Sequence, residues 1–334
     1  MKIVEIKDGV KVKKPGIYRM SNDWYHDDCT VEPSASSTML FRLLNECPAK
    51  VYYDSYLPAR YSKNKKKVKR EDNDRFDLGD ACHTAVLEGQ FWTDRCTIVP
   101  SGNWSSPRAQ FLKKQAQQQG GVALLKMQAT KVFAMRDALL ADKQARELVT
   151  SGQNELSYFW FDEARGIWVK VRPDVRRRCK ENLVHVVDYK TSQGSVAARS
   201  VAYRMAEFGY HVSAAMYLDV MEKVEGKRPA SFTLLCQETT KPHLLNILPI
   251  GELALDWGKI QLRAALDLFT ECVKRKQWPQ YVRGETLEIP RNIEVGLEER
   301  KDRGEFGTGG RTIDDETVKR VFGWGSEIKN LEAY

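Results

Sequence analysis

The chain has 334 residues, of which 42% are hydrophobic, and it carries a formal net charge of +8 at pH 7 with a pI near 9.0. This composition is that of a globular protein with one large domain or two ordinary ones. No apolar run approaches the roughly 18 to 20 residues that span a bilayer, and the first residues lack the organisation of a signal peptide. We therefore expect a cytoplasmic protein with no membrane partner.

The seven cysteines include no CxxC pair, which argues against a zinc ribbon and against a disulfide scaffold. We expect free thiols, with Cys82 and Cys236 in the core. The positive charge fits a polyanionic partner, and it is concentrated in the runs 63–70 and 176–180. The first run is typical of a solvated loop, whereas the second lies between two charged strand ends.

The first half of the sequence predicts helices. Serines at 34, 36 and 37 offer cap oxygens for a helix that ends before Pro48. A polar linker over 60–74 leads to a second helix in FDLGDACHTAVLEG, with Asp77 as its cap and Gly89 at its end. After a glutamine-rich segment, a long amphipathic helix is expected over about 122–149.

The second half of the sequence predicts mainly strands. Two apolar runs in ELSYFWFDEARGIWVKVRPD flank a hairpin turn, and LVHVVDYK has the β-branched composition of a central strand. A helix over about 201–223, two further strands in SFTLLCQET and HLLNILPI, and a last helix follow. This order indicates an α/β fold with a mixed central β-sheet flanked by helices. A polar tail over 291–334 is expected to be loosely attached, with a short helix at 314–322.

Charged residues stand at the ends of two of these strands. Asp188 and Lys190 lie two apart, so their side chains share one face of a strand. If the strand 167–172 pairs beside 184–189, Asp174 reaches the same edge. Two such carboxylates raise each other's pKa unless a cation joins them, and oxygen ligands suit Mg²⁺ or Mn²⁺. Without further context, an Asp–Lys ion pair at an exposed strand end is the preferred interpretation of this pattern.

Pro173-Asp174, thirteen residues, and then Asp188-Tyr189-Lys190 resemble the core of the PD-(D/E)XK nucleases. Within that superfamily the chain most resembles the exonuclease VIII (RecE-like) and lambda-type phage recombination exonucleases. The resemblance covers about residues 20–281 and is carried, in chain order, by SNDWYHDD, LLNECPAKVYYDSYL, GDACHTAVLEG, ELSYFW, RPD, DYKTS and GYHVSAAMYLD. It implies a restriction-endonuclease-like nuclease core over 76–290, with a helical and loop region over 1–75 packed on it.

The resemblance places the metal-binding carboxylates of the family on Asp174 and Asp188, a carbonyl ligand on Tyr189 and the catalytic lysine on Lys190. That lysine would position a water for attack on a phosphodiester, or meet a phosphate as a point charge.

Two more catalytic and metal-binding positions follow from the same comparison. The histidine of the family falls on His83, which could instead be a helix residue facing its own core. Glu155 matches an acidic position that holds a second metal or its water, and it could instead be a surface charge on a strand.

One position departs from the pattern of the related nucleases. Their Gln-x-x-x-Tyr becomes Ser213-Ala-Ala-Met-Tyr217. Because serine is shorter than glutamine, a contact to DNA or to the rim of the site is either lost or supplied by His211 or Gln193. Tyr217 itself is a candidate for the site. Further candidates for phosphate or DNA-end contacts, each of which could also be an ordinary surface residue, are Arg176, Arg177, Arg199, Arg204 and Trp104.

The resemblance implies a metal-dependent exonuclease, with Mg²⁺ as the expected ion and Mn²⁺ as the alternative, that degrades linear double-stranded DNA from 5′ to 3′. It would leave 3′ overhangs for a single-strand annealing recombinase, form a homo-oligomeric ring (trimer or tetramer), and act in the cytoplasm of a bacterial host cell. The alternatives are a Cas4-like or RecB-like single-strand exonuclease, an endonuclease with the same core, and a non-catalytic DNA-binding module.

Overall fold

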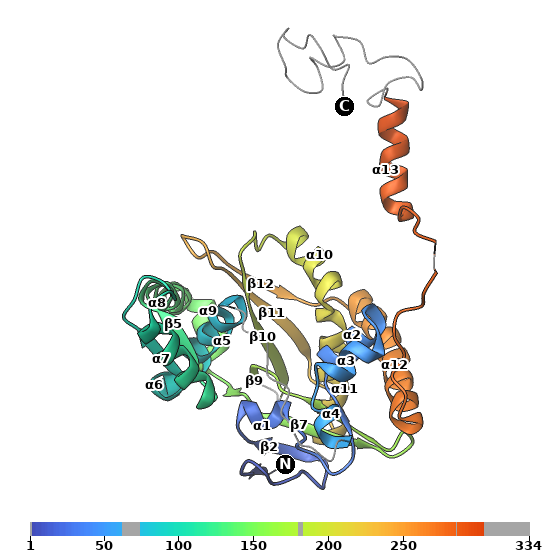
Figure 1. Ribbon diagram of the computed structural model, residues 1–334, viewed down its shortest axis with the longest axis horizontal. Coiled ribbons are helices and arrows are strands. Elements are labelled where there is room, and N and C mark those ends of the chain that lie inside the picture. The colour runs from blue at the N-terminus through green and yellow to red at the C-terminus, as the bar shows by residue number, and fades with distance from the viewer. Residues whose placement is uncertain (1, 62–73, 180–182, 285, 304–334) are drawn as a thin grey trace. The chain divides into compact units, whose positions relative to one another are not determined.

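A computed structural model describes residues 2–61, 74–179, 183–284 and 286–303 (Figure 1). The chain divides into two units, Met1–Tyr281 and Val282–Tyr334, which are described separately here. Within the described residues, no helix is both long and apolar enough to cross a membrane. All seven cysteines are free, and Cys82 and Cys236 are buried as expected.

The first unit is built around two mixed five-stranded sheets. One has the order β12 (Leu245–Pro249), β11 (Ser231–Glu238), β10 (Val184–Ser192), β9 (Val175–Arg178) and β6 (Gln153–Asn154). The other has the order β1 (Ile3–Glu5), β2 (Gly16–Arg19), β7 (Ser157–Asp162), β8 (Ile167–Val171) and β3 (Ser34–Ala35). The hairpin β7–β8 and the central strand β10 confirm the expectations from the sequence.

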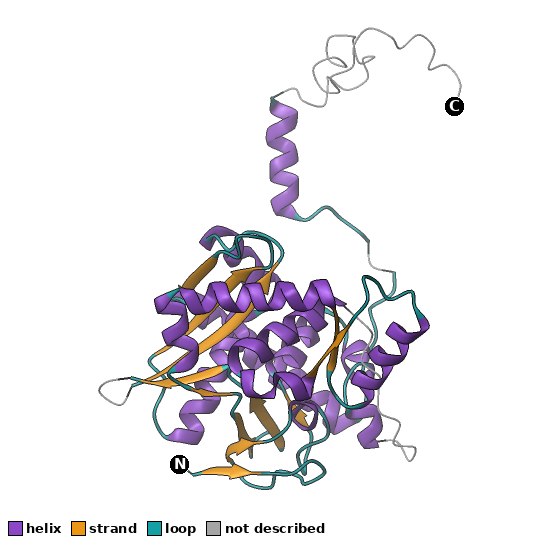
Figure 2. Ribbon diagram, turned by 90° about the vertical axis from the view of Figure 1, so that its left-hand side faces the viewer, coloured by secondary structure: helices purple, strands orange, loops and turns teal. Residues whose placement is uncertain are grey.

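Helices cover both faces of the sheet that contains β10. Odd-numbered residues of β10, such as Val187 and Tyr189, pack with α5 (Asp74–Leu87), α8 (Lys126–Ala141) and α9 (Lys143–Thr150). Even-numbered ones, such as Val186, pack with α11 (Tyr210–Glu225) and α12 (Glu252–Arg275). Figure 1 shows these two groups of helices on opposite sides of β10 and β11, and Figure 2 shows the first group from its outer side. The mixed α/β fold with helices on both faces therefore agrees with the predicted fold class.

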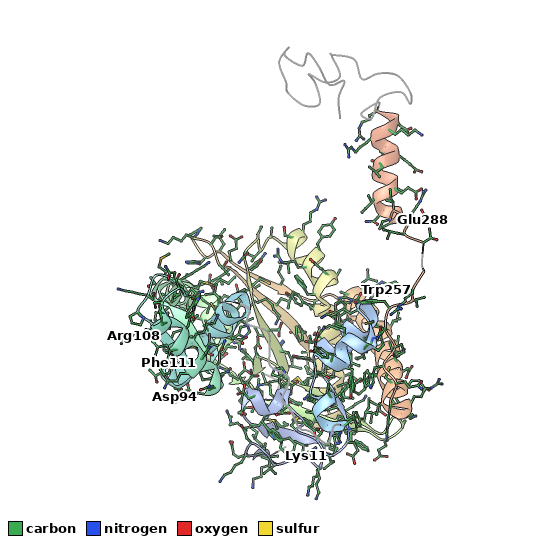
Figure 3. All side chains as sticks on the ribbon, viewed as in Figure 1. Lys11, Asp94, Arg108, Phe111, Trp257 and Glu288 are labelled. Atoms are coloured by element: carbon green, nitrogen blue, oxygen red, sulfur yellow. The ribbon has the colours of Figure 1, made fainter. Side chains whose placement is uncertain are left out.

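The remaining elements of this unit are short or peripheral. Strands β4 (Cys96–Val99) and β5 (Val122–Leu125) form a parallel pair. The other helices are α1 (Asn22–His26), α2 (Ser37–Asn45), α3 (Pro48–Tyr53), α4 (Leu57–Tyr61), the 3₁₀ turn η1 (Gly89–Phe91), α6 (Trp92–Arg95), α7 (Pro107–Gln118) and α10 (Ala198–Phe208). Several helices leave large side chains in solvent: Phe111 of α7 is 65% exposed and Trp257 of α12 is 58% exposed (Figure 3).

Four details differ from the sequence-based expectations. Helix α5 begins at Asp74, so Asp77, which was expected to cap it, lies within the helix. The strands β8 and β10 lie in different sheets; the chain crosses from one sheet to the other at Pro173, and the arginine-rich segment after it forms β9, which pairs with β10. The long helix expected over 122–149 is β5 followed by α8 and α9, because Asp142 caps a new helix by accepting the N–H of Ala145.

The helix expected over 201–223 is also two helices, α10 and α11. They are separated by Gly209, which adopts a left-handed conformation with φ +70°. The ring of Phe41 lies close to this glycine, so that a Cβ built there would approach Cδ2 of Phe41 to 2.3 Å. A residue with a side chain would disturb both the turn and its packing.

In the second unit, the described part contains the helix α13 (Arg291–Asp302), at the start of the segment expected to be a polar tail. The helix expected at 314–322 and the lysine-rich run 63–70 lie outside the described residues.

Candidate metal and nuclease site

The pairing of β9 with β10 brings Asp174 to the middle of the central strand, next to the residues that follow Val187. Val175 is opposite Val187 in this antiparallel pair, so the residue before β9 meets the residues after Val187. The backbone N–H of Tyr189 donates a hydrogen bond to Oδ2 of Asp174 at 2.7 Å. Asp174 therefore lies beside Asp188, as expected, but Asp188 is inside β10 and not at a strand end, and β9 and not β8 makes the pairing.

Two further predicted residues converge on Asp174. His83 comes from α5, and its Nδ1 lies 3.5 Å from Oδ2 of Asp174. Glu155 follows β6 in a left-handed conformation (φ +56°), and its backbone N–H donates to the carbonyl of Asp174 at 3.2 Å. Ligand atoms of His83, Glu155 and Asp174 all lie within 4.8 Å of one another. The three side chains thus face one small volume.

This volume is part of a pocket of about 190 Å³. Besides the three clustered residues, it is lined by Asn22, Tyr25, His26, Asp80, Thr84, Glu88, Arg95, Arg172 and Tyr217. Helices α1, α5 and α11 contribute to this lining together with the segment between the two sheets. The pocket is polar and partly enclosed, which suits a charged ligand.

Asp188 and Lys190 form an ion pair beside this cluster. Oδ2 of Asp188 lies 2.6 Å from Nζ of Lys190, and Asp188 is not one of the three clustered ligand residues. The ammonium of Lys190 lies 5.7 Å from the centre of the Tyr210 ring. The ion pair shows that Asp188 and Lys190 share one face of β10, as expected, although neither side chain is part of the pocket lining.

The electrostatics of the site favour a cation. Burial, together with the neighbouring charge of Asp188, raises the pKa of Asp174 well above its usual value. Burial alone would lower the pKa of Lys190, but the carboxylates of Asp188 and Asp174 outweigh it and raise that pKa. Burial and the charge of Lys190 lower the pKa of His83, which favours the neutral imidazole that can ligate a metal.

The donor set fits a divalent metal ion. Two carboxylates and a neutral imidazole around one point are ligands for Mn²⁺ and similar ions, while the carboxylates and the carbonyl of Tyr189 suit Mg²⁺. Asp188 lies beside them as a further carboxylate. The role of the Tyr189 carbonyl remains a prediction.

Arg172 is a site residue that the sequence analysis did not single out. Its side chain is nearly buried, and its Nε donates to Oε2 of Glu155 at 2.7 Å. Its Nη1 donates to the carbonyl of Met20 and to Oγ of Ser157, both at 3.2 Å. A buried arginine at the end of a strand requires a hydrogen-bonding partner. The position of Arg172 in the sequence could therefore have indicated that it contacts a site residue.

The predicted DNA contacts are in different situations. Arg176 is 7% exposed and is bound by Glu225, and Arg177 pairs with Glu147. Arg204 donates to the carbonyl of Ser195 at 2.5 Å, whereas Arg199, at the start of α10, is exposed. Arg199 is thus the member of this group whose side chain is open to solvent.

The remaining candidates also differ in their surroundings. Tyr217 lines the pocket, and burial raises its pKa. Ser213 donates to Oγ of Ser37 at 3.0 Å, and Nε2 of His211 lies 2.6 Å from Oε1 of Gln261. Trp104 lies away from this pocket, under the ammonium of Lys113 at 4.8 Å. The structure therefore places Tyr217 in the pocket and links Ser213 to it through Ser37, which also hydrogen-bonds Tyr217. His211 and Trp104 contact other residues.

A mixed sheet in which Asp174, just before β9, lies beside Asp188 and Lys190 of β10 is the arrangement of the PD-(D/E)XK class of proteins. The family model for the PDDEXK-like domain of unknown function (DUF3799) matches residues 37–291. The chain belongs to this family.

A crystal structure of a protein from Eubacterium rectale that is provisionally named an exonuclease shares this fold, with a TM-score of 0.54. The two chains are 12% identical over 83% of this chain and 97% of the other. A second structure, SSO0001, is similar over 63% of this chain and 79% of its own, with 10% identity and a TM-score of 0.28. No curated protein sequence matches the chain.

Proposed function

We propose that the protein is a metal-dependent exodeoxyribonuclease that degrades linear double-stranded DNA from its 5′ ends and leaves 3′ single-stranded overhangs. The observation that carries this proposal is the convergence of His83, Glu155 and Asp174 within 4.8 Å, beside the Asp188–Lys190 pair. Two or more carboxylates, a lysine and a partly enclosed polar pocket are what hydrolysis of a phosphodiester requires.

The residues that would hold Mg²⁺ or Mn²⁺ are Asp174, Asp188, Glu155 and His83, with the carbonyl of Tyr189. A divalent ion held there supplies a Lewis acid for the scissile phosphate and makes a water more acidic. Its charge also compensates the mutual repulsion of Asp174 and Asp188.

The side chains of the chain itself orient the reactants. Lys190, held at 2.6 Å by Asp188, donates hydrogen bonds to the attacking water or to a phosphate oxygen. Arg172 donates a hydrogen bond to Oε2 of Glu155 at 2.7 Å, so that the carboxylate keeps its orientation in the pocket. Tyr217 closes one wall of the pocket against solvent.

The arginines proposed to contact DNA differ in how far their side chains are exposed to solvent. Arg199 is the cation that is open to a phosphate, and Arg204, which is partly exposed, lies on the same helix. The 5′ to 3′ polarity, a homo-oligomeric ring around the DNA, a partner recombinase that anneals single strands, and action in a bacterial cytoplasm are parts of the proposal that rest on the sequence resemblance.

The test is digestion of linear and covalently closed circular duplex DNA, in Mg²⁺, in Mn²⁺ and in chelator. We expect loss of the linear form alone, only with metal, and release of 5′-labelled nucleotides before 3′-labelled ones. Lys190→Ala should lower the rate by about 100-fold or more, since positioned proton-transfer groups contribute about that much. Lys259→Ala is a matched control, because Lys259 also pairs with an aspartate but lies on α12 away from the pocket.

Other outcomes would contradict the proposal in distinct ways. Cutting of the circular form would indicate an endonuclease, and a preference for single strands would indicate a Cas4-like or RecB-like enzyme. Binding without hydrolysis in either metal would indicate a non-catalytic DNA-binding module.

A further inference from the structure

A second pocket, of about 490 Å³, lies on the surface of the first unit and shares no lining residue with the metal site. Its lining consists of Ala49, Tyr52, Tyr53, Tyr61, Lys276 and Trp278. Four of these six side chains are large aromatic rings, one is a lysine, and none is a carboxylate. This composition is unusual for a surface in which charged groups of both signs normally alternate.

The walls of this aromatic pocket are fixed by the backbone. Helix α12 ends at Arg275, and the next residue, Lys276, is left-handed (φ +55°) and turns the chain so that Trp278 comes back to α3. The N–H of Ala49 donates to the carbonyl of Pro279 at 3.0 Å and joins the start of α3 to this returning segment. Figure 1 shows α3 beside α12. The pocket is therefore preformed.

The rings inside it are partly braced and partly free. The indole of Trp278 lies 5.1 Å from the ring of Tyr52 at an interplanar angle of 33°, and it also contacts Phe269 edge-on at 5.9 Å. Tyr53 and Tyr61 are 73% and 40% exposed. Tyr52 and Trp278 thus form a packed aromatic floor, and the exposed rings of Tyr53 and Tyr61 stand at its rim, where a planar ligand can stack on them.

Aromatic ring faces next to a lysine favour a ligand that is both planar and negatively charged. Unpaired nucleobases stack on aromatic side chains irrespective of sequence, and their phosphates are neutralised by lysine. In a duplex the base faces are already stacked, so only a single strand offers them. A pocket of a few hundred Å³ has the volume for a small organic group such as a nucleoside.

We propose that this aromatic pocket binds single-stranded DNA, with bases stacked against Tyr53, Tyr61 and Trp278 and a phosphate bound by Lys276. The site is separate from the metal site and goes beyond the proposed nuclease function. It does not require that the metal site be active.

The test is the binding of a fluorescently labelled oligothymidylate, followed by anisotropy in chelator so that no hydrolysis occurs. Tyr53→Ala and Tyr61→Ala should each weaken binding by about tenfold, the effect of losing one stacked base, and Tyr53→Trp should preserve it. Lys276→Gly removes the charge at a position where glycine suits the backbone, and it should lower the slope of log K against log salt by about 0.7. Tyr203→Ala is the control, because Tyr203 is 68% exposed but lines neither pocket.

Unchanged binding in both tyrosine variants would overturn the proposal. So would loss of binding in Asp174→Asn alone, since the strand would then occupy the metal site. Failure of the protein to bind the oligonucleotide at all would refute the aromatic site while leaving the duplex digestion experiment to decide the nuclease function.

Discussion

Asp174 and Asp188 lie close together, but their surroundings have opposite effects on the stability of their negative charges. Asp188 is paired with Lys190 at 2.6 Å, whereas the charge of Asp174 is destabilised by burial and by Asp188. The poorly compensated charge of Asp174 lowers the stability of the metal-free protein, as is common at sites that bind a ligand.

Asparagine substitutions should separate these two roles. In chelator, we expect Asp174→Asn to raise the free energy of unfolding by about 1 kcal/mol, because it removes a poorly compensated buried carboxyl. Asp188→Asn should lower it by about 1 to 2 kcal/mol, because it leaves Lys190 without its partner. We also expect Mn²⁺ to raise the melting temperature of the unmodified protein and to have no such effect on either variant. Urea denaturation and thermal melts measure these effects, and a stabilised Asp188→Asn variant would contradict the assignment.

Among the secondary-structure elements, the junction of α10 and α11 depends on one glycine. Gly209 and Gly226 are both left-handed, with φ values of +70° and +76°, and both follow the last residue of a helix. A Cβ at Gly226 would meet nothing within 4 Å, but a Cβ at Gly209 would meet the Phe41 ring. The two positions therefore differ in packing and not in backbone conformation.

Alanine substitutions at Gly209 and Gly226 should separate the cost of the left-handed backbone from the cost of displacing Phe41. Gly226→Ala should cost about 1 kcal/mol from the left-handed backbone alone, and Gly209→Ala about 3 kcal/mol once the displacement of Phe41 is added. Chemical denaturation of the two variants gives the comparison. Equal losses would show that Phe41 moves aside without cost.

The same elements show what could be read from the sequence. Alternation and turn composition were sufficient for β7, β8 and β10, because these strands are local patterns with a buried face. β9 was missed because its sequence, Val-Arg-Arg-Arg, has no apolar alternation; its Arg176 is accommodated by Glu225, which is far away in the chain. Long-range partners of this kind cannot be derived from a local pattern.

The site followed a similar division. The motif predicted Asp174, Asp188 and Lys190 as site residues, and the resemblance added His83 and Glu155. Of these five residues, Asp174, His83 and Glu155 form one cluster in the structure. The engagement of Arg172 with Glu155 and of Ser213 with Ser37 depends on how α2, α11 and the two sheets pack, which the sequence alone did not supply.

At the scale of the whole molecule, one buried network holds the two sheets together. Glu225 at the end of α11 accepts hydrogen bonds from Nε of Arg176 on β9 and from the hydroxyl of Tyr158 on β7, each at 2.7 Å. Burial would raise the pKa of Glu225, but these two hydrogen bonds outweigh it and lower the pKa. The network therefore depends on the ionised carboxylate.

Its contribution should vary with pH. Because the pKa is lower in the folded state, the stabilisation is fully present above the unfolded value of about 4.3 and is lost as the pH falls through the folded value. Glu225→Gln should lower the free energy of unfolding by about 3 kcal/mol at pH 7, with a gap to the unmodified protein that narrows toward pH 3. Denaturant titrations across this range measure the gap. Glu222→Gln, on the exposed side of the same helix, should show almost no gap at any pH.

The crossing at Pro173 also determines where the chain tolerates changes in length. Residues added to the turn between β7 and β8 would only extend a hairpin at the surface. One residue added between Arg172 and Val175 would shift the alternation of β9 against β10, and it would turn either Asp174 or Arg176 away from its partner. Homologous chains should therefore vary in length at the hairpin while the spacing from Arg172 to Arg176 stays constant.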